Sequence, residues 1–136
     1  FEALASATAL IRQTREAMDN APKSLMWELC GGDKRMADGK TVFEAAGRGD
    51  RTAAMVVERY IGYLAVGITN LVNLFQPEII CIGGGVSLAG AALLEPLKQI
   101  VAAGDYARDS SVRTEIRLAE LGNDAGLIGA ALLGRR

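Results

Sequence analysis

The chain has 136 residues, half of them hydrophobic, which suits one domain with a buried core or part of a larger domain. Its 15 basic and 16 acidic residues are interleaved and leave a net charge of −1, so no basic face is available to bind nucleic acid. No apolar run is long enough to span a bilayer, which indicates that no membrane is a partner.

Histidine is absent, which excludes a Ser-His-Asp or Cys-His mechanism and a His-ligated metal within this segment. The two cysteines form neither a disulfide framework nor a metal-ligand pattern, and a reducing, cytoplasmic setting fits them best. Phe1 follows no initiating Met and precedes no signal-peptide pattern. We therefore expect the chain to be a piece of a longer protein.

The first 50 residues are expected to be mainly helical. The composition of Glu2 to Met18 predicts one amphipathic helix, and a short helical turn should follow from Ser24 to Cys30. Trp27 in that turn is interpreted as a core anchor rather than as a platform for a sugar or base. Thr41 and Glu44 have the spacing of a capping box, which predicts a helix that begins at Thr41 and ends near Gly47.

The longest element should run from Arg51 to Phe75, with Asp50 as its N-cap. Apolar residues recur there at steps of four and three, as on one face of a helix: Val57, Ile61, Leu64, Ile68, Leu71 and Phe75. Gly62 and Gly67 are weak helix formers, and the simplest explanation is close approach by another backbone. We expect this helix to be a principal packing element.

A strand followed by three glycines is the most informative feature of the second half. The apolar run Ile79 to Ile82, which includes Cys81, predicts a strand that is covered on both faces. Gly83, Gly84 and Gly85 follow at its carboxyl end, where open α/β sheets bind ligands, and the helix expected just beyond would direct free N–H groups at an anion.

A helix, a second strand and a last helix complete the chain. The helix spans Gly90 to Val101, although Pro96 favours a start nearer Leu94, and the strand lies within 113–121. The last helix, Ala125 to Leu133, should pack through apolar residues: Ile128, Ala131 and Leu132. A helical crossover makes the two strands parallel neighbours, or near neighbours, in one sheet. Because two such strands do not form a stable sheet, we expect further strands before Phe1.

The residues of the glycine turn leave its role open between backbone packing and ligand binding. No Gly-Lys-Ser/Thr follows, which excludes a Walker P-loop, and the dinucleotide fingerprint fails because Leu88 occupies its third position. On the sequence alone, Glu2 is simply an acid at a helix start.

Three segments, in order and spacing, resemble the carboxyl-terminal half of the ROK family of bacterial sugar kinases and repressors. They are Pro77 to Ser87, Leu121 to Ala131, and the opening Phe1-Glu2-Ala3 with Ser6 to Leu10, which is most similar to the glucokinases of the family. The resemblance implies the carboxyl-terminal part of an actin-like (ribonuclease H-like) ATPase fold, an α/β fold that is helix-rich with a partial parallel sheet. It divides the chain into a mainly helical part, 1–76, and a nucleotide-binding part, 77–136.

The resemblance also implies the site residues and cofactors. Gly83, Gly84, Gly85 and Val86 would bind the adenosine of ATP, and the Glu2 carboxylate would bind sugar hydroxyls. The phosphate loop, the catalytic aspartate and the zinc ligands of the family all lie before Phe1, so no catalytic residue and no metal ligand is expected in this chain. The implied activity of the parent protein is transfer of a phosphoryl group from ATP, with Mg²⁺, to a hexose, and the similarity to glucokinases favours glucose as that hexose.

This segment alone should be inactive, and the parent protein should be a homo-oligomer that also contains the missing amino-terminal part. Two alternatives stay open. The first is a ROK transcriptional repressor, in which the same half of the protein binds an inducer sugar. The second is a bare oligomerisation domain, for which we expect no nucleotide binding by the full-length protein.

Overall fold

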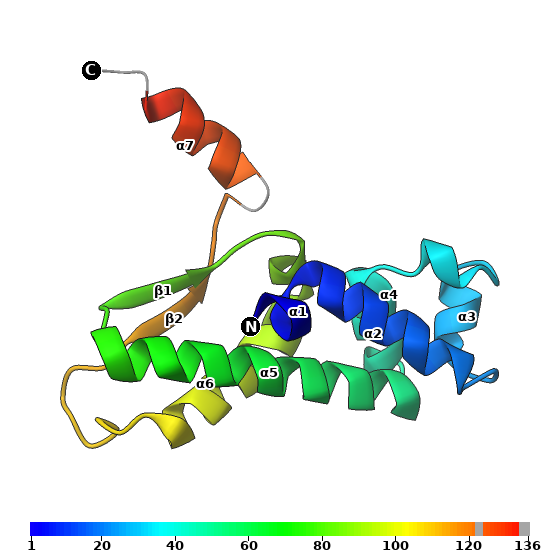
Figure 1. Cartoon of the computed structure of the whole chain (residues 1–136), viewed down its shortest axis with the longest axis horizontal. Helices are drawn as coiled ribbons and strands as arrows, with labels where there is room; N and C mark the ends of the chain where they lie inside the picture. Colours follow the sequence, from blue (N-terminus) through cyan, green and yellow to red (C-terminus); the bar gives the residue numbers. More distant parts are fainter. Residues whose placement is uncertain (122–123, 134–136) are drawn as a thin grey trace.

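The computed structural model describes residues 1–121 and 124–133, apart from the side chain of Ala125. Helices dominate, and two short strands lie at one end of the molecule (Figure 1). The first half contains α1 (Glu2–Ala5), α2 (Ala7–Asp19), α3 (Leu25–Leu29), the 3₁₀ helix η1 (Lys34–Met36), α4 (Gly39–Gly47) and α5 (Arg51–Phe75). The second half contains β1 (Ile79–Ile82), the 3₁₀ helix η2 (Gly85–Ala89), α6 (Ala91–Gly104), β2 (Glu115–Leu118) and α7 (Ala125–Leu133).

The first helical segment is broken at Ser6, so the prediction of one helix from Glu2 to Met18 was wrong. Ser6 is extended, with φ −82° and ψ 165°, and it separates α1 from α2. Its hydroxyl accepts a hydrogen bond from the Ala9 N–H over 3.0 Å, which caps α2. Serine competes well with helical hydrogen bonding, and this local bond favours the break.

The cap of α4 lies three residues earlier than predicted. The Asp38 carboxylate accepts the Thr41 N–H over 2.8 Å, and the Thr41 hydroxyl accepts the Asp38 N–H over 3.2 Å. Thr41 is therefore the second partner of a capping box that begins at Asp38. Glu44 instead pairs with Arg48 at 2.6 Å on the exposed side. The predicted end of the helix near Gly47 is confirmed.

Helix α5 has the predicted limits, and the Asp50 carboxylate caps it by accepting the Ala53 N–H over 2.9 Å. Ile61, Leu64 and Ile68 are buried as expected. Leu71 and Phe75 are exposed, and the buried face is completed by other residues: Ala53, Val56, Tyr60, Ala65 and Val72. This face is broader than one stripe because α2, α4 and α6 all pack against α5.

The core lies between α5 and the helices around it. Its fully buried large side chains come from several elements: Leu10, Met18, Met26, Val42, Tyr60, Leu93 and Leu97. The predicted anchoring role of Trp27 is confirmed, since its half-buried ring packs against this core. Its indole N–H donates to the carbonyl oxygens of Met18 and Ala21, at 3.3 and 3.1 Å.

Strands β1 and β2 pair in parallel, in the register Ile79 to Glu115 through Ile82 to Leu118, which confirms the expected crossover. The expectation that β1 is covered on both faces was wrong for this chain. Ile79 is 46% exposed and Cys81 is exposed, whereas Ile80 and Ile82 pack against the core. Alternate side chains of a strand point to opposite faces, so the described helices cover one face of the pair.

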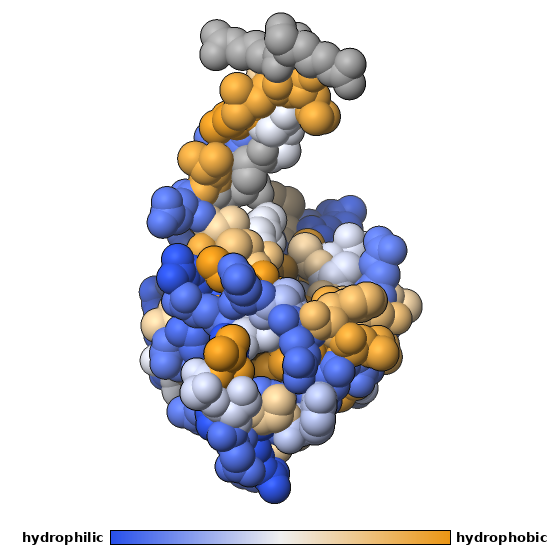
Figure 2. All heavy atoms as spheres, turned by 90° about the vertical axis from the view of Figure 1, so that its left-hand side faces the viewer, coloured by the Kyte–Doolittle hydropathy of each residue, from blue (hydrophilic) through white to orange (hydrophobic). Residues whose placement is uncertain are grey.

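The last two helices differ from the sequence expectations. Helix α6 begins at Ala91 rather than near Leu94, and it contains Pro96, which offers no N–H to the Ala92 carbonyl. Helix α7 projects from the body (Figure 1). Its apolar side chains stand clear of the more hydrophilic surface below (Figure 2), and Leu133 is 84% exposed. The prediction that α7 packs was therefore wrong for this chain.

None of the helices described is long and apolar enough to cross a membrane.

Candidate functional site

The glycine turn leads the chain out of β1 and back toward α4. Gly84 has φ +78°, a conformation that favours glycine. The Ser87 hydroxyl and the Ser87 N–H donate to the Gly84 carbonyl, at 2.7 and 3.1 Å, and hold the turn closed. The chain then forms η2 rather than an α-helix directly, which corrects the expectation of a helix just beyond the glycines.

A cavity of about 690 Å³ is lined by η2, by α4, which packs against η2, and by the start of α2. Its walls are mainly apolar: Ala7, Leu10, Ile11, Gly39, Phe43, Gly85, Val86, Leu88, Ala89 and Ala92. Its volume falls within the usual range of small-molecule sites. Of the residues predicted to bind nucleotide, Gly85 and Val86 line this cavity, and Gly83 and Gly84 form the turn that leads to it.

Among the residues that the structure describes, the charged members of the cavity wall come from α4 and its cap. They are Asp38, Lys40 and Glu44. Burial alone would raise the pKa of Asp38, but hydrogen bonds from the Thr41 N–H and hydroxyl outweigh it and lower the pKa below the ordinary value of 3.8. Asp38 is therefore ionised at neutral pH and can accept hydrogen bonds from hydroxyl groups of a ligand.

The N-terminus of α6 also reaches the cavity, through Ala92. Gly90 is the N-cap, with φ +61°, and it has no side chain with which to accept the N–H groups of the first turn. The positive end of the α6 dipole and these N–H groups can therefore meet a negative group of a ligand. The α-helix that the sequence predicts beyond the glycines therefore begins after η2, one 3₁₀ helix further along the chain than expected.

Glu2 lies outside this cavity. It is the first residue of α1, and its side chain is exposed. Helix α1 packs against both α2 and α5. The structure therefore does not join the two predicted sites, Glu2 and the glycine turn, in one pocket of the described residues.

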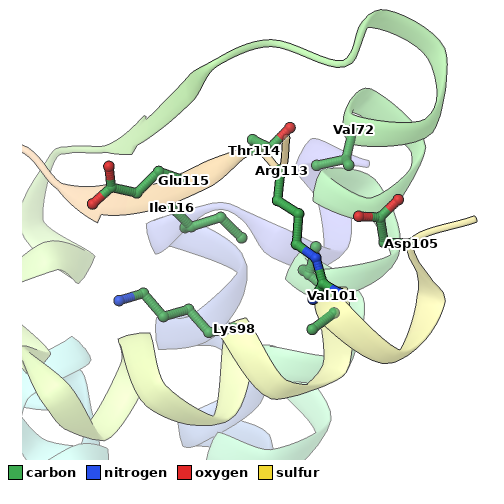
Figure 3. A pocket seen from close by; sticks show the side chains of 9 residues that line it. Val72, Lys98, Val101, Asp105, Arg113, Thr114, Glu115 and Ile116 are labelled. Atoms are coloured by element: carbon green, nitrogen blue, oxygen red, sulfur yellow. The ribbon is translucent and has the colours of Figure 1, made fainter. Parts of the chain in front are cut away.

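A second cavity, of about 220 Å³, lies between α6, the end of α5 and the start of β2 (Figure 3). Its charged residues balance one another: Lys98, Asp105, Arg113 and Glu115. It opens at the amino end of β2, because Glu115 is the first residue of that strand. Ligands of parallel sheets bind at the carboxyl ends of the strands, which favours the larger cavity as the functional site.

Sequence reasoning missed the α4 side of the larger cavity. Asp38, Gly39, Lys40 and Phe43 are not among the residues that the sequence predicts to bind a ligand. A local signal did exist, since Asp38 and Thr41 have capping-box spacing and would have placed the start of α4 correctly. No local pattern indicates that α4 faces η2, because α4 ends at Gly47 and η2 begins only at Gly85.

The residues that the structure describes contain no group of three His, Cys, Asp or Glu side chains able to hold a metal. Cys30 is buried, Cys81 is exposed, and both are free. The described residues therefore do not supply the ligand set of a protein-bound zinc ion.

Comparisons with known proteins agree with the resemblance seen in the sequence. The chain is 43% identical over 132 residues to a glucokinase from Thermotoga maritima, a match that covers 96% of this chain and 41% of the relative. It is 41% identical over 134 residues to a glucokinase from Halalkalibacterium halodurans, covering 98% of this chain and 40% of the relative. The chain thus spans about two fifths of the length of these curated relatives.

A solved structure shows the same fold. The ROK family glucokinase from Streptomyces griseus, determined in complex with glucose and AMPPNP, superimposes with a TM-score of 0.86 at 30% identity. The match covers 98% of this chain and 44% of that one. The expected fold class, part of an actin-like ATPase fold with a two-stranded parallel sheet, is therefore confirmed. The model of the ROK family matches residues 1–136, and the chain belongs to that family.

Proposed function

We propose that this chain is the carboxyl-terminal part of an ATP-dependent hexose kinase of the glucokinase type. The observation that carries the proposal is the glycine turn, which leads to an apolar cavity of about 690 Å³ in a chain 43% identical to a glucokinase. Residues 77–136 supply the nucleotide side of the site, and residues 1–76 supply the helical part that bears Glu2.

The cavity suits an adenosine group. Val86, Phe43 and Leu88 offer apolar surface to a flat base. The ionised Asp38 carboxylate can accept hydrogen bonds from ribose hydroxyls, and Gly85 lets the ligand approach the backbone closely. The α6 N-terminus then favours the negative phosphate groups.

Glu2 is proposed to bind hydroxyl groups of a hexose, with glucose as the preferred substrate. Its side chain is exposed, so it is free to accept hydrogen bonds from a sugar at the surface of α1. The glucose in the complex of the Streptomyces griseus relative supports this choice of substrate.

The remaining functions are assigned to the part of a ROK kinase that this chain does not contain. That part would supply the general base and the ligands for Mg²⁺ and zinc, and this chain alone would not phosphorylate sugar. It would also cover Ile79, Cys81 and the apolar side of α7, which are exposed here. We further propose a homo-oligomeric, cytoplasmic protein.

The test uses the full-length protein that carries this chain. ATP-dependent phosphorylation of glucose is expected, and Val86→Trp, which fills the cavity, should raise KM for ATP at least tenfold. Val112→Trp, at an exposed loop position, is the matched control and should leave KM unchanged. Sugar-dependent DNA binding without phosphorylation would instead identify a repressor, and no ATP binding at all would identify an oligomerisation domain.

A further inference from the structure

The carbonyl groups that end α1 are all hydrogen-bonded, although the helix has only one turn. Three of them accept from side chains: the Ala3 oxygen from Arg12 Nη2 at 2.9 Å, the Leu4 oxygen from Gln13 Nε2 at 2.9 Å, and the Ala5 oxygen from Tyr60 Oη at 3.0 Å. The fourth, on Glu2, accepts the Ser6 N–H at 3.1 Å. Helix ends normally leave such carbonyls to water or to caps.

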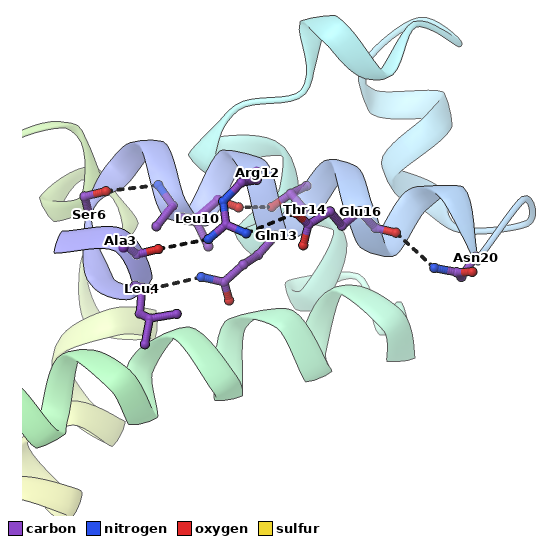
Figure 4. A network of polar contacts seen from close by, with 10 residues as sticks. Ala3, Leu4, Ser6, Leu10, Arg12, Gln13, Thr14, Glu16 and Asn20 are labelled. Atoms are coloured by element: carbon purple, nitrogen blue, oxygen red, sulfur yellow. Dashed lines mark hydrogen bonds and ion pairs between the residues drawn. The ribbon is translucent and has the colours of Figure 1, made fainter. Parts of the chain in front are cut away.

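The side-chain donors come from two other elements. Arg12 and Gln13 extend from α2 toward α1 (Figure 4), and Tyr60 reaches it from α5. An isolated turn of helix has almost no stability of its own, because nucleation fixes several residues for a single hydrogen bond. The position of α1 therefore depends on these three donors, here named the α1 clamp.

Gln13 shows how closely its amide is matched to α1. The side chain is only 3% exposed, and its Oε1 has no hydrogen-bond partner among the described residues. The opposite orientation of the amide would set Oε1 against the Leu4 carbonyl, oxygen to oxygen. The Leu4 carbonyl thus determines the orientation of the Gln13 amide, whose Nε2 donates to it.

Tyr60 is 1% exposed, and burial raises the pKa of its phenol to about 12. The phenol therefore stays protonated, as a donor, throughout the physiological range of pH.

Helix α5, which bears Tyr60, also contacts Phe1, the residue before Glu2. The Phe1 ring lies against Gly67, where a Cβ atom would overlap the ring.

From these contacts we infer that Arg12, Gln13 and Tyr60 are positioning residues for Glu2, so that α2 and α5 together fix the sugar-binding carboxylate. The inference rests on the proposed function of Glu2. A carboxylate that binds hydroxyls must be placed within a few tenths of an ångström, and a shift of about 1 Å can reduce activity about a hundredfold. The clamp provides that placement through the α1 backbone, because each of its three side chains donates to a carbonyl group of α1.

The test measures KM for glucose and KM for ATP separately in the full-length protein. Tyr60→Phe removes the hydroxyl that donates to Ala5 and should raise KM for glucose about three- to tenfold, with KM for ATP unchanged. Tyr63→Phe is the matched control on the same helix, because the Tyr63 hydroxyl forms no hydrogen bond with the described residues, and it should change neither constant.

Gln13→Leu is the second variant, because it removes the donor to Leu4 together with the unpaired Oε1 and should therefore preserve folding. It should raise KM for glucose to a similar extent. Normal KM values for both substrates in Tyr60→Phe and Gln13→Leu, or a loss confined to thermal stability, would overturn the inference.

Glu2→Gln separates this inference from the proposed function. It should raise KM for glucose at least tenfold. An unchanged KM in Glu2→Gln would overturn the role of Glu2 itself, whereas a raised KM in Glu2→Gln with unchanged clamp variants would overturn the clamp alone.

Discussion

The Ser24 hydroxyl donates a hydrogen bond of 2.7 Å to Oδ2 of Asp50, which lies 26 residues further along the chain. The same oxygen accepts the Leu25 N–H over 2.6 Å, and Oδ1 accepts the Ala53 N–H over 2.9 Å. One carboxylate therefore caps α5 and also binds the first N–H of α3. The Asp50 side chain therefore joins the start of α5 to the start of α3.

Asp50→Ala should destabilise the protein by about 2 kcal/mol, because it removes the cap of α5 and leaves the Leu25 N–H without its acceptor. The measurement is urea unfolding of the full-length protein, followed by circular dichroism. Asp109→Ala, in the exposed loop before β2, is the control and should change stability by less than about 0.5 kcal/mol. Equal effects of the two substitutions would show that Asp50 has no special role.

The elements that the sequence predicted well are those with a complete local signal. Helix α5 has a capping residue and a long apolar period, and β1 has an apolar run bounded by Pro77 and the glycines. The break at Ser6 and the cap at Asp38 were missed because a single side-chain hydrogen bond decides each of them. At Ser6 a helical composition continues across the boundary, whereas at Asp38 the Gly39 that follows is typical of a turn.

Only the side of the site that the glycine turn forms could be predicted from the sequence. Gly85 and Val86 follow a strand in a recognisable pattern, and both line the cavity. Asp38 and Phe43 reach the same cavity through the packing of α4 against η2. The clamp is equally non-local, since 55 residues separate Tyr60 from Ala5. Such contacts depend on how helices pack, which the periodicity of one helix does not determine.

Acid should weaken the protein through Asp50. Burial alone would raise its pKa, but hydrogen bonds from Ala53, Ser24 and Leu25 together lower it below 3.8. The folded state thus holds the proton less tightly than the unfolded state, so this contribution is present above pH 3.8 and is lost as pH falls through the lower, folded pKa.

Asp50→Asn keeps a capping oxygen but cannot titrate. Its free energy of unfolding should therefore fall less than that of the unmodified protein between pH 5 and pH 3, measured by urea titration at each pH. Parallel pH dependence in the two proteins would contradict the lowered pKa of Asp50.

Two glycines of α5 should respond differently to the same substitution. A Cβ atom on Gly62 meets nothing within 4 Å, so Gly62→Ala should stabilise the protein by about 1 kcal/mol through helix propensity. A Cβ atom on Gly67 would overlap the Phe1 ring, so Gly67→Ala must displace Phe1. It should gain less stability, because the same propensity gain is opposed by this collision.

Gly67→Ala also tests α1, because Phe1 adjoins Glu2. In the full-length protein, KM for glucose should rise in Gly67→Ala and stay normal in Gly62→Ala, with KM for ATP normal in both. Thermal unfolding compares the stabilities of the two variants, and steady-state kinetics compares their KM values for glucose and ATP. A larger increase of melting temperature in Gly67→Ala than in Gly62→Ala would exclude the predicted collision.

The reactivity of the two free cysteines tests whether the exposed face of the sheet is covered in the full-length protein. Cys30 is buried in the core, whereas Cys81 is exposed on β1. A thiol reagent should therefore modify Cys81 of the 136-residue chain rapidly and Cys30 only on unfolding, as mass spectrometry of peptides would show. In the full-length protein, strands that cover this face should slow the reaction of Cys81 at least tenfold. A Cys81 that reacts equally fast in both proteins would mean that β1 stays uncovered, and the helices of this chain alone would then account for the burial of the sheet.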